Sequence, residues 1–360
     1  MQWLHVTSLL REWDSDGKPQ IAEHVVKPLR IVFLGSDAIA LPGLEWMERN
    51  GCEIGRVVGV FTQPDRASGR GQKPAPNAIK QWALDRSIPV LQPARLDSGA
   101  TELLQALDAD VSLVMAYGHI LKDYFIATPR LGTLNLHASL LPRYRGASPI
   151  QSAIAQGDRE TGVSLMRIVR ALDAGPVAQM ATVGIEARDT AVEVEAKLAA
   201  VCGPLLGASL PRLADGSLAF VEQDHAAASY CRRLVKDDGR LDFARPATEI
   251  AARICGLFPW PGCIVDIAGV VIKVGLADAR SETVQRLAPG TILGADDAGL
   301  RIATGAGVVR LLKLQRPGGR MLSAGEFLRG FPISAGLQVP SHPMPALVAS
   351  RPFPFRGPSP

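Results

Sequence analysis

Residues 29–61 read LRIVFLGSDAIALPGLEWMERNGCEIGRVVGVF, and this pattern decides the fold class. Leu29–Leu34 is a short apolar run that ends at Gly35, a helical pattern covers residues 41–50, and Val57–Phe61 is a second apolar run. Short apolar runs bounded by turn residues are typical of buried strands. The strand-helix-strand opening therefore predicts a parallel sheet that is covered by helices.

The same alternation continues along the chain, and it predicts further strands and helices. The expected helices cover residues 77–86, 101–107, 150–156 and 192–213, and the expected strands cover residues 111–115, 132–138 and 163–169. We therefore expect an α/β domain with a Rossmann-like, mostly parallel sheet at residues 29–213. In open sheets of this kind ligands bind at the carboxyl ends of the strands.

The character of the chain changes after residue 213. A polar segment at residues 214–229 is a plausible linker, and residues 230–338 contain short apolar runs separated by Gly, Asp and Pro turns, which predict a small β-barrel. Residues 339–360 are rich in proline and show no apolar period, so we expect a disordered tail. Residues 1–28 precede the first expected strand as an N-terminal extension and match none of these patterns.

Composition excludes several classes of protein. No apolar run approaches the roughly 18 residues of a membrane span, and the first 30 residues carry scattered charges where a signal peptide needs an apolar centre. We expect a cytoplasmic protein with no membrane contact. The 5 cysteines form no C-x-x-C pair, so we expect neither a metal site nor a disulfide framework.

The net charge of +4 is small, but cations gather in two stretches that contain no acid. The cations of residues 66–84 are Arg66, Arg70, Lys73 and Lys80, and those of residues 298–325 are Arg301, Arg310, Lys313, Arg316 and Arg320. Each stretch alone is more typical of a solvated basic face. Two of them together favour an RNA partner, because phosphate neutralisation is a main source of nucleic-acid affinity.

Residues 135–146 read NLHASLLPRYRG and carry the side chains best suited to chemistry. Along an extended strand Asn135, His137 and Ser139 share one face, and at about 3.3 Å per residue the first two lie roughly 7 Å apart. An Asn amide and a protonated imidazole can both stabilise an oxyanion. Asp173, in the later sequence Leu-Asp-Ala-Gly, can orient the imidazole and favour its charged form. Acyl transfer without a covalent nucleophile is the expected chemistry.

Other interpretations of these residues are weaker. A lone histidine on an apolar strand is usually a core residue, but the neighbouring Asn135 and Asp173 argue against that here. Ser139 could belong to a Ser-His-Asp hydrolase, yet no G-x-S-x-G sequence surrounds it. The chain has no G-x-G-x-x-G motif and no Walker lysine, so neither a nicotinamide nor a nucleoside triphosphate is indicated.

The Asn-x-His sequence, the Ser-Leu-Leu-Pro that follows it and the later Leu-Asp-x-Gly loop resemble the folate-dependent formyltransferases. The resemblance spans roughly residues 30–335 and is strongest to the members that formylate methionyl-tRNA. It implies transfer of a formyl group from 10-formyltetrahydrofolate to the α-amine of initiator methionyl-tRNA. It also implies that the second domain is an OB-like β-barrel.

The resemblance implies a role for each site residue. Asn135, His137 and Asp173 would be catalytic. The residues expected to contact folate are Ser139, Leu140, Leu141 and Pro142, with Ala116, Tyr117 and Gly118. The residues expected to contact tRNA are Arg66, Arg70 and Lys73, in the long loop at residues 63–76. An ordinary strand end and a plain turn remain alternatives for the two folate segments. Lys122 replaces a proline that is common in the family.

Folate and initiator methionyl-tRNA are therefore the expected partners, with no metal and no obligatory protein partner. A formyltransferase for a nucleotide-linked amino sugar is the first alternative, and it should lack the basic loop. Enzymes that formylate glycinamide ribonucleotide lack both this loop and the second domain. An RNA-binding protein without activity would keep the basic stretches but would not need Asn135, His137 and Asp173 together.

Overall fold

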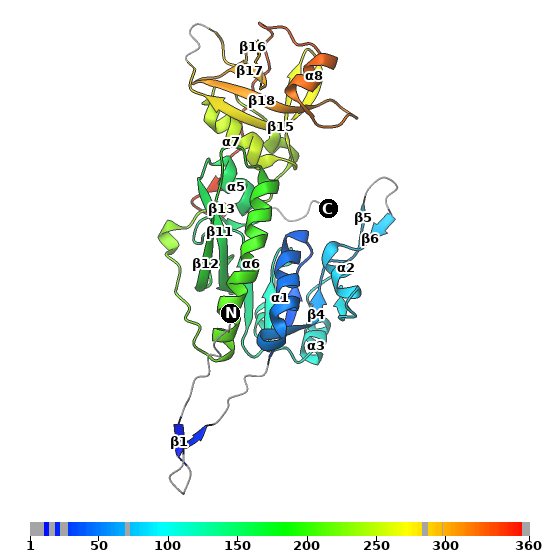
Figure 1. Ribbon diagram of the computed structural model, residues 1–360, viewed down its shortest axis with the longest axis vertical. Helices are drawn as coiled ribbons and strands as arrows, with labels where there is room; N and C mark the ends of the chain where they lie inside the picture. The colour runs from blue at the N-terminus through cyan, green and yellow to red at the C-terminus, as the bar shows by residue number, and fades with distance from the viewer. Residues whose placement is uncertain are drawn as a thin grey trace, which may run out of the picture.

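The computed structural model describes residues 11–13, 19–21, 28–68, 73–282, 287–296 and 298–354. Figure 1 shows an N-terminal domain, in blue to green, and a C-terminal domain, in yellow to orange, stacked along the longest axis. Helix α5 (Pro149–Ala155) of the first domain packs against helix α7 (Ala247–Leu257) of the second. Of residues 1–28, strands β1 (Arg11–Trp13) and β2 (Pro19–Ile21) form an antiparallel pair.

The N-terminal domain is built on a 7-stranded sheet. In sheet order its strands are β12 (Val177–Gly184), β11 (Glu160–Arg167), β9 (Thr133–His137), β8 (Val111–Val114), β3 (Leu29–Leu34), β4 (Gly55–Phe61) and β7 (Val90–Leu91). Strands β9 to β7 are parallel, whereas β11 is antiparallel to both of its neighbours. The predicted mostly parallel sheet is confirmed, with an antiparallel edge.

Strand β3 is almost entirely apolar because both of its faces are covered. Leu29, Ile31 and Phe33 belong to the core on one face of the sheet, and Val32 and Leu34 belong to the core on the other. Helices cover both faces, so every residue of the strand except Arg30 is buried. The helices are α1 (Leu41–Ile54), α2 (Ala78–Leu84) and α6 (Ala191–Ala214) on the first face, and α3 (Ser98–Ala106) and α4 (Asp123–Ile126) on the second.

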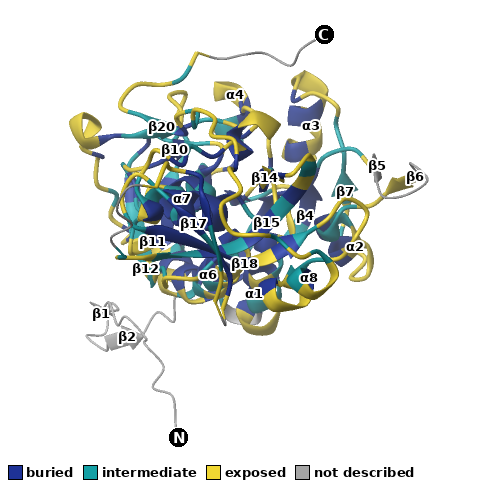
Figure 2. Ribbon diagram, turned by 90° about the horizontal axis from the view of Figure 1, so that it is seen from above, coloured by how far each residue is buried: buried dark blue, intermediate teal, exposed yellow. Residues whose placement is uncertain are grey.

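The C-terminal domain is an antiparallel β-domain whose sheet curls beside α7 (Figure 1). Its strands are β14 (Cys263–Ile267), β15 (Val270–Arg280), β18 (Val308–Gln315), β17 (Leu300–Ala303) and β16 (Ile292–Ala295), and β19 (Leu322–Ser323) pairs with β18. Helix α8 (Ala324–Gly330) follows β19. Figure 2 shows buried residues gathered inside and exposed residues on the outer loops and helices. The expected small β-domain is confirmed.

The proline-rich tail is ordered up to residue 354, contrary to expectation. Val339 and Leu347 are each 1% exposed and belong to the core of the C-terminal domain. Backbone carbonyls of the tail accept hydrogen bonds although its prolines cannot donate: Arg253 Nη2 donates to Pro345 O at 2.9 Å. Strand β20 (Val348–Ala349) then pairs with β13 (Tyr230–Cys231). Residues 355–360 lie outside the described residues.

Short elements complete the described chain. They are η1 (Ala38–Ala40), β5 (Arg66–Ser68), β6 (Lys73–Ala75), β10 (Arg145–Gly146), η2 (His225–Ala227) and η3 (Lys236–Gly239). Strand β13 lies between β10 and β20 in a 3-stranded sheet, which joins the N-terminal domain, the two residues that follow the linker and the tail. In the described part of the chain, no helix combines the length and apolarity that crossing a membrane requires.

Helices α1 and α6 cross closely because glycines of α6 face an indole ring. A Cβ on Gly203 would lie 2.4 Å from Cγ of Trp46, and one on Gly207 would lie 2.5 Å from its Cη2. The ring therefore occupies the space that larger side chains of α6 would fill. A capping box at Thr190 and Glu193 begins this 24-residue helix.

We predict that Gly203→Ala destabilises the protein by about 1–3 kcal/mol, because the added methyl group must displace the ring of Trp46. Gly51→Ala is the matched control, since a Cβ there meets nothing within 4 Å. The control should stabilise helix α1 by about 0.5–1 kcal/mol. Thermal unfolding followed by circular dichroism measures both. A melting temperature of Gly203→Ala at or above that of the unsubstituted protein would disprove the close crossing.

Candidate active site

Strand β9 lies between β8 and β11 and presents its two polar side chains on one face. Leu134 and Leu136 point into the main core, so Asn135 and His137 point to the opposite face, as the alternation predicts. The strand ends at His137, and the alternation does not extend to Ser139. Ser139 is fully buried, and its hydroxyl donates to Arg143 O at 2.6 Å. Its side chain therefore stabilises the turn after the strand.

The ring of His137 is held from both sides and is only 6% exposed. Its Nε2 lies 2.9 Å from Tyr144 O, and its Nδ1 lies 3.7 Å from Oδ2 of Asp173. A carbonyl oxygen can only accept, so Nε2 carries the hydrogen. In the neutral ring Nδ1 then keeps its lone pair, and it can take up a proton beside a carboxylate.

Tyr144 is fixed so that its carbonyl meets the imidazole. Its φ is +56°, and its hydroxyl donates to Oδ2 of Asp158 at 2.6 Å. The guanidinium of Arg143 donates to the same oxygen at 2.6 Å. Burial, followed by the hydrogen bond to Asp158, raises the pKa of the Tyr144 hydroxyl, so it stays protonated and keeps donating. The tautomer of His137 thus depends on the position of Tyr144, whose side chain is held by Asp158, 14 residues later in the chain.

Asp173 reaches His137 from a loop that folds back over the sheet. Strand β11 runs antiparallel to β9, with Arg167 opposite Leu134, so the loop leaves the sheet near the start of β9 rather than at its carboxyl end. The loop then runs back along the sheet and brings Asp173 to His137, at the carboxyl end of β9. Asp173 has a φ of +45°, and its Oδ2 accepts a hydrogen bond from Gly146 N at 2.8 Å.

Asn135 is the third residue of the group, and its side-chain amide is available to a ligand. Its side chain makes no hydrogen bond among the residues that the structure describes, and it is half-buried. The loops that follow β8 and β11, the two strands beside β9, expose the apolar side chains of Ile120, Val169 and Leu172. The site thus combines a free amide donor and an imidazole on one strand, which suits a carbonyl group.

Ala116, Tyr117 and Gly118 form the turn after β8, with φ of +49° at Ala116 and +80° at Gly118. The Tyr117 side chain is 2% exposed and packs in the core with Phe125, so it is structural. Gln63 Nε2 donates to Tyr117 O at 3.1 Å and holds the turn. Any contact of this turn with folate would use its backbone and exposed edges, and the assignment stays a prediction.

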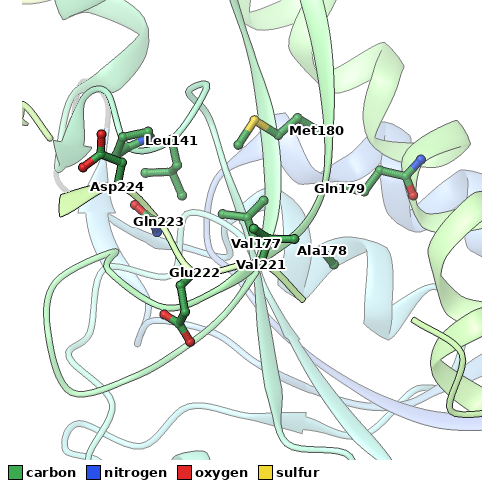
Figure 3. Close-up of a pocket in the computed structure, with 10 residues that line it drawn as sticks. Leu141, Val177, Ala178, Gln179, Met180, Val221, Glu222, Gln223 and Asp224 are labelled. Carbon is green, nitrogen blue, oxygen red and sulfur yellow. The ribbon is translucent and has the colours of Figure 1, made fainter. Parts of the chain in front are cut away.

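The turn of Ser139, Leu140, Leu141 and Pro142 borders a cavity of about 370 Å³. Figure 3 shows residues of this turn, of β12 and of the segment after α6 around the cavity. Leu141, Val177 and Met180 give it apolar walls, and Asn135, His137 and Asp173 do not line it. The cavity therefore lies beside the catalytic group, and the folate contact of this turn stays a prediction.

Neither a thiol nucleophile nor a metal centre is evident at the site. Burial raises the pKa of the Cys231 thiol to about 11, and its Sγ lies 3.6 Å from Tyr144 O. A thiol held in its neutral form is a poor nucleophile. Within the residues that the structure describes, no three His, Cys, Asp or Glu side chains are placed to hold a metal ion.

The first basic stretch lies partly outside the described residues. Arg70 is among the residues that are not described, and the same holds for the side chains of Arg66 and Lys73. Their backbone belongs to β5 and β6, which form an antiparallel hairpin. Lys80 Nζ donates to Asp65 at 2.6 Å and lowers the pKa of that carboxyl, so the charge of Lys80 is largely neutralised.

The second basic stretch is less basic in three dimensions than in sequence. Arg301 pairs with Glu282, and Arg310 is buried and pairs with Asp278 at 2.7 Å. Lys313, Arg316 and Arg320 are exposed and form no ion pair in the described part of the chain. These three cations are the ones available to an anionic partner.

Comparison with known families agrees with this geometry. The profile of a family described as formyl transferase matches residues 29–206, and that of the formyl transferase C-terminal domain matches residues 233–332. The chain belongs to the formyl transferase family. As a formyltransferase, it has both domains of the family, and the expected linker at residues 214–229 lies between the two matched ranges.

Two curated relatives of this formyltransferase share the name methionyl-tRNA formyltransferase. Methionyl-tRNA formyltransferase of Pseudomonas syringae pv. syringae is 43% identical over 300 residues, which is 83% of this chain and 94% of that protein. The enzyme of the same name from Myxococcus xanthus is 42% identical over 311 residues, which is 86% of this chain and 97% of the other. Similarity at this level extends over both domains.

Solved structures similar to this formyltransferase show the same fold. The sugar 3N-formyltransferase WlaRD matches with a TM-score of 0.60 at 18% identity, over 80% of this chain and 98% of that one. An N-formyltransferase from Helicobacter canadensis matches with a TM-score of 0.59 at 17% identity, over 79% of this chain and 99% of that one. At such identities the likeness concerns the fold alone.

Sequence reasoning missed two backbone groups of the formyltransferase site. They are the Tyr144 carbonyl, which sets the histidine tautomer, and the Gly146 N–H, which holds Asp173. Both lie in the RYRG sequence that follows the catalytic strand, and this sequence contributed to the resemblance. Backbone groups leave no trace in residue identity, although a Cβ on Gly146 would lie 2.1 Å from Cys231 O, which explains why glycine is needed there.

His137→Ala should lower the turnover of formyl transfer by about 10²- to 10⁴-fold, the usual contribution of a positioned acid-base group. Asn135→Ala should lower it by about 10²- to 10³-fold, as expected for a lost oxyanion donor. Folding should be nearly unchanged, because neither side chain belongs to a hydrophobic core of the domain. Single-turnover kinetics measures the losses, and near-normal turnover in either variant would refute that assignment.

Asp173→Asn keeps the size of the side chain and removes the charge beside Nδ1 of His137. We expect lower turnover and a changed pH–rate profile, because the protonated imidazole loses its carboxylate partner. Circular dichroism should report an unchanged fold. A pH–rate profile identical to that of the unsubstituted protein would show that Asp173 does not influence the ionisation of His137.

Proposed function

We propose that this formyltransferase transfers the formyl group of 10-formyltetrahydrofolate to the α-amino group of methionine on initiator tRNA. One observation carries the proposal: Nδ1 of His137 keeps a lone pair beside Asp173, on the strand that also presents the free amide of Asn135. Its curated relatives, which match at 42–44% identity over most of the chain, bear the name methionyl-tRNA formyltransferase.

The residues divide the work of the transfer. The folate supplies an activated formyl group on its N10 atom. Asn135 donates a hydrogen bond to the formyl oxygen while the amine adds to the carbon. His137 Nδ1 takes the proton that the amine loses, and Asp173 stabilises the resulting cation. The same proton then passes to N10 as the bond between carbon and N10 breaks, which leaves tetrahydrofolate and formylmethionyl-tRNA.

The site fits a folate by the chemistry of its groups. A pterin is flat and apolar on its faces and polar at its edge. The loops beside β9 expose Ile120, Val169 and Leu172 for the faces, and the turn at Ala116–Gly118 exposes backbone for the edge. The absence of a reactive thiol at the described site agrees with direct transfer to the amine. We propose a cytoplasmic location because methionyl-tRNA is used there by the ribosome.

Formylation of a nucleotide-linked amino sugar is the second candidate function. It is favoured by the fold likeness to sugar N-formyltransferases, but these are only 17–18% identical. The convergence of Asn135, His137 and Asp173 makes an inactive RNA-binding protein a poorer explanation.

A direct assay separates these functions. The purified protein is incubated with 10-formyltetrahydrofolate and either initiator methionyl-tRNA or dTDP-3-aminofucose. We expect formylmethionyl-tRNA to form and the sugar nucleotide to remain unchanged. Asp173→Asn serves as the control for enzyme-dependent transfer. Activity on the sugar nucleotide alone would overturn the proposal.

The basic loop should contribute recognition rather than chemistry. Arg70→Ala should lower kcat/KM with methionyl-tRNA. The lost transition-state stabilisation should be about 1.5–3 kcal/mol, the range for a lost hydrogen bond to a charged group. The salt dependence of tRNA binding should become shallower, because one phosphate contact is lost. If Arg70 reads a base edge, discrimination between initiator and elongator tRNA falls instead.

Lys73→Ala is the control for the basic loop and should act through charge alone. It should make the salt dependence shallower and leave discrimination between the two tRNAs unchanged. An Arg70→Ala protein that equals the unsubstituted one in efficiency, salt dependence and discrimination would contradict tRNA contact by this loop.

A further inference from the structure

Arg145 is a buried cation whose partners are all neutral. It is 2% exposed, and Nε and Nη2 donate to Oε1 of Gln223 at 3.1 and 2.6 Å. Nη1 donates to the hydroxyl of Tyr230 at 3.3 Å, and Nη2 lies 3.0 Å from Nδ1 of His225. A buried arginine usually pairs with a carboxylate, and Arg145 instead orients an amide.

Gln223 can adopt only one orientation between its neighbours. Arg145 only donates, so Oε1 of Gln223 must face it. The amide nitrogen then faces the catalytic loop and donates to Asp173 O at 2.9 Å and to Gly175 O at 2.7 Å. Both amide hydrogens and the carbonyl oxygen are thus used, and the side chain is only 8% exposed.

These bonds fall on the strained part of the catalytic loop. Asp173 is a non-glycine residue with a φ of +45°, a conformation that costs of order 1–3 kcal/mol unless its surroundings hold it. Gln223 donates to the carbonyl of Asp173 itself and to that of Gly175, two residues later. Gly146 N, which directly follows Arg145, binds the carboxylate of Asp173. Gln223, which Arg145 orients, therefore holds the backbone of Asp173, and Gly146 holds its side chain.

We propose that Gln223 and Arg145 are positioning residues for the catalytic carboxylate, which makes the segment between the domains part of the active site. Gln223 keeps Asp173 in its left-handed conformation, and Arg145 keeps the Gln223 amide turned toward the loop. For its kinetic readout this inference rests on the proposed formyl transfer.

Gln223→Glu separates positioning from packing. The glutamate has nearly the same shape and gains an ion pair with Arg145, so the fold should be retained. Both of its oxygens are acceptors, however, so they cannot bind Asp173 O or Gly175 O. We expect an unchanged melting temperature and a kcat lowered by on the order of 10- to 100-fold, as for a misplaced catalytic group. The KM for methionyl-tRNA should stay within about threefold.

Gln105→Glu is the matched control, because it makes the same chemical change on an exposed side chain of α3. It should leave kcat and the melting temperature unchanged. The double variant Gln223→Glu/Asp173→Asn tests the route of the effect. If Gln223 acts through Asp173, the double variant should be no slower than Asp173→Asn alone, within about threefold. Additive losses, or normal kcat in Gln223→Glu, would overturn the inference.

A crystal structure of the Gln223→Glu protein tests the inference without substrate. We expect the Asp173 carboxylate to move away from Nδ1 of His137, beyond the 3.7 Å seen here, while the sheet stays in place. An unmoved Asp173 would refute positioning by Gln223 whatever the enzyme formylates. Failure of the unsubstituted protein to formylate methionyl-tRNA would instead refute the proposed function.

Discussion

The two-residue strand β10, Arg145–Gly146, is the constraint on which the catalytic geometry depends. Gly146 has a φ of +115°, and a Cβ there would lie 2.1 Å from Cys231 O, so only glycine fits. The strand pairs with β13, which pairs with β20 of the tail. The carbonyl just before the strand holds His137, and its last N–H holds Asp173. The proposed catalytic group therefore forms where the first domain meets the segment that directly follows the linker, with the tail beside it.

The same short segment fixes the position of the second domain. Helix α5 begins at Pro149, soon after Gly146, and packs against α7. A Cβ on Gly256 of α7 would lie 2.7 Å from Gln151 O, so the two helices touch through their backbones. Arg188 of the first domain also donates to Asp278 of the second at 2.7 Å. A substrate that contacts both domains thus meets a surface defined close to His137.

Local sequence patterns predicted the features that depend on residues close together in the chain, such as strands β3 and β9. The apolar residues of β3 pack against helices on both faces, and the alternation in β9 places Asn135 and His137 together. The role of Gln223 could not be predicted, because it binds backbone carbonyls about 50 residues earlier in the chain. Composition could not predict that residues 339–354 pack on the second domain, because this depends on two isolated apolar residues, Val339 and Leu347, and on backbone pairing of β20.

The charge of the C-terminal domain also could not be predicted from the sequence, because the sequence shows the cations but not the carboxylates that pair with them. The hydrogen bond from Arg310, and a further one from Arg188, lowers the pKa of Asp278, so this carboxylate stays ionised and holds both arginines. A phosphate that took Arg310 from it would remove the strongest partner of a half-buried carboxylate, which is costly. Arg310 is therefore part of the domain's interior rather than of its surface. Phosphate contacts in this basic stretch are left to Lys313, Arg316 and Arg320, whose exposed side chains lose only water when they bind.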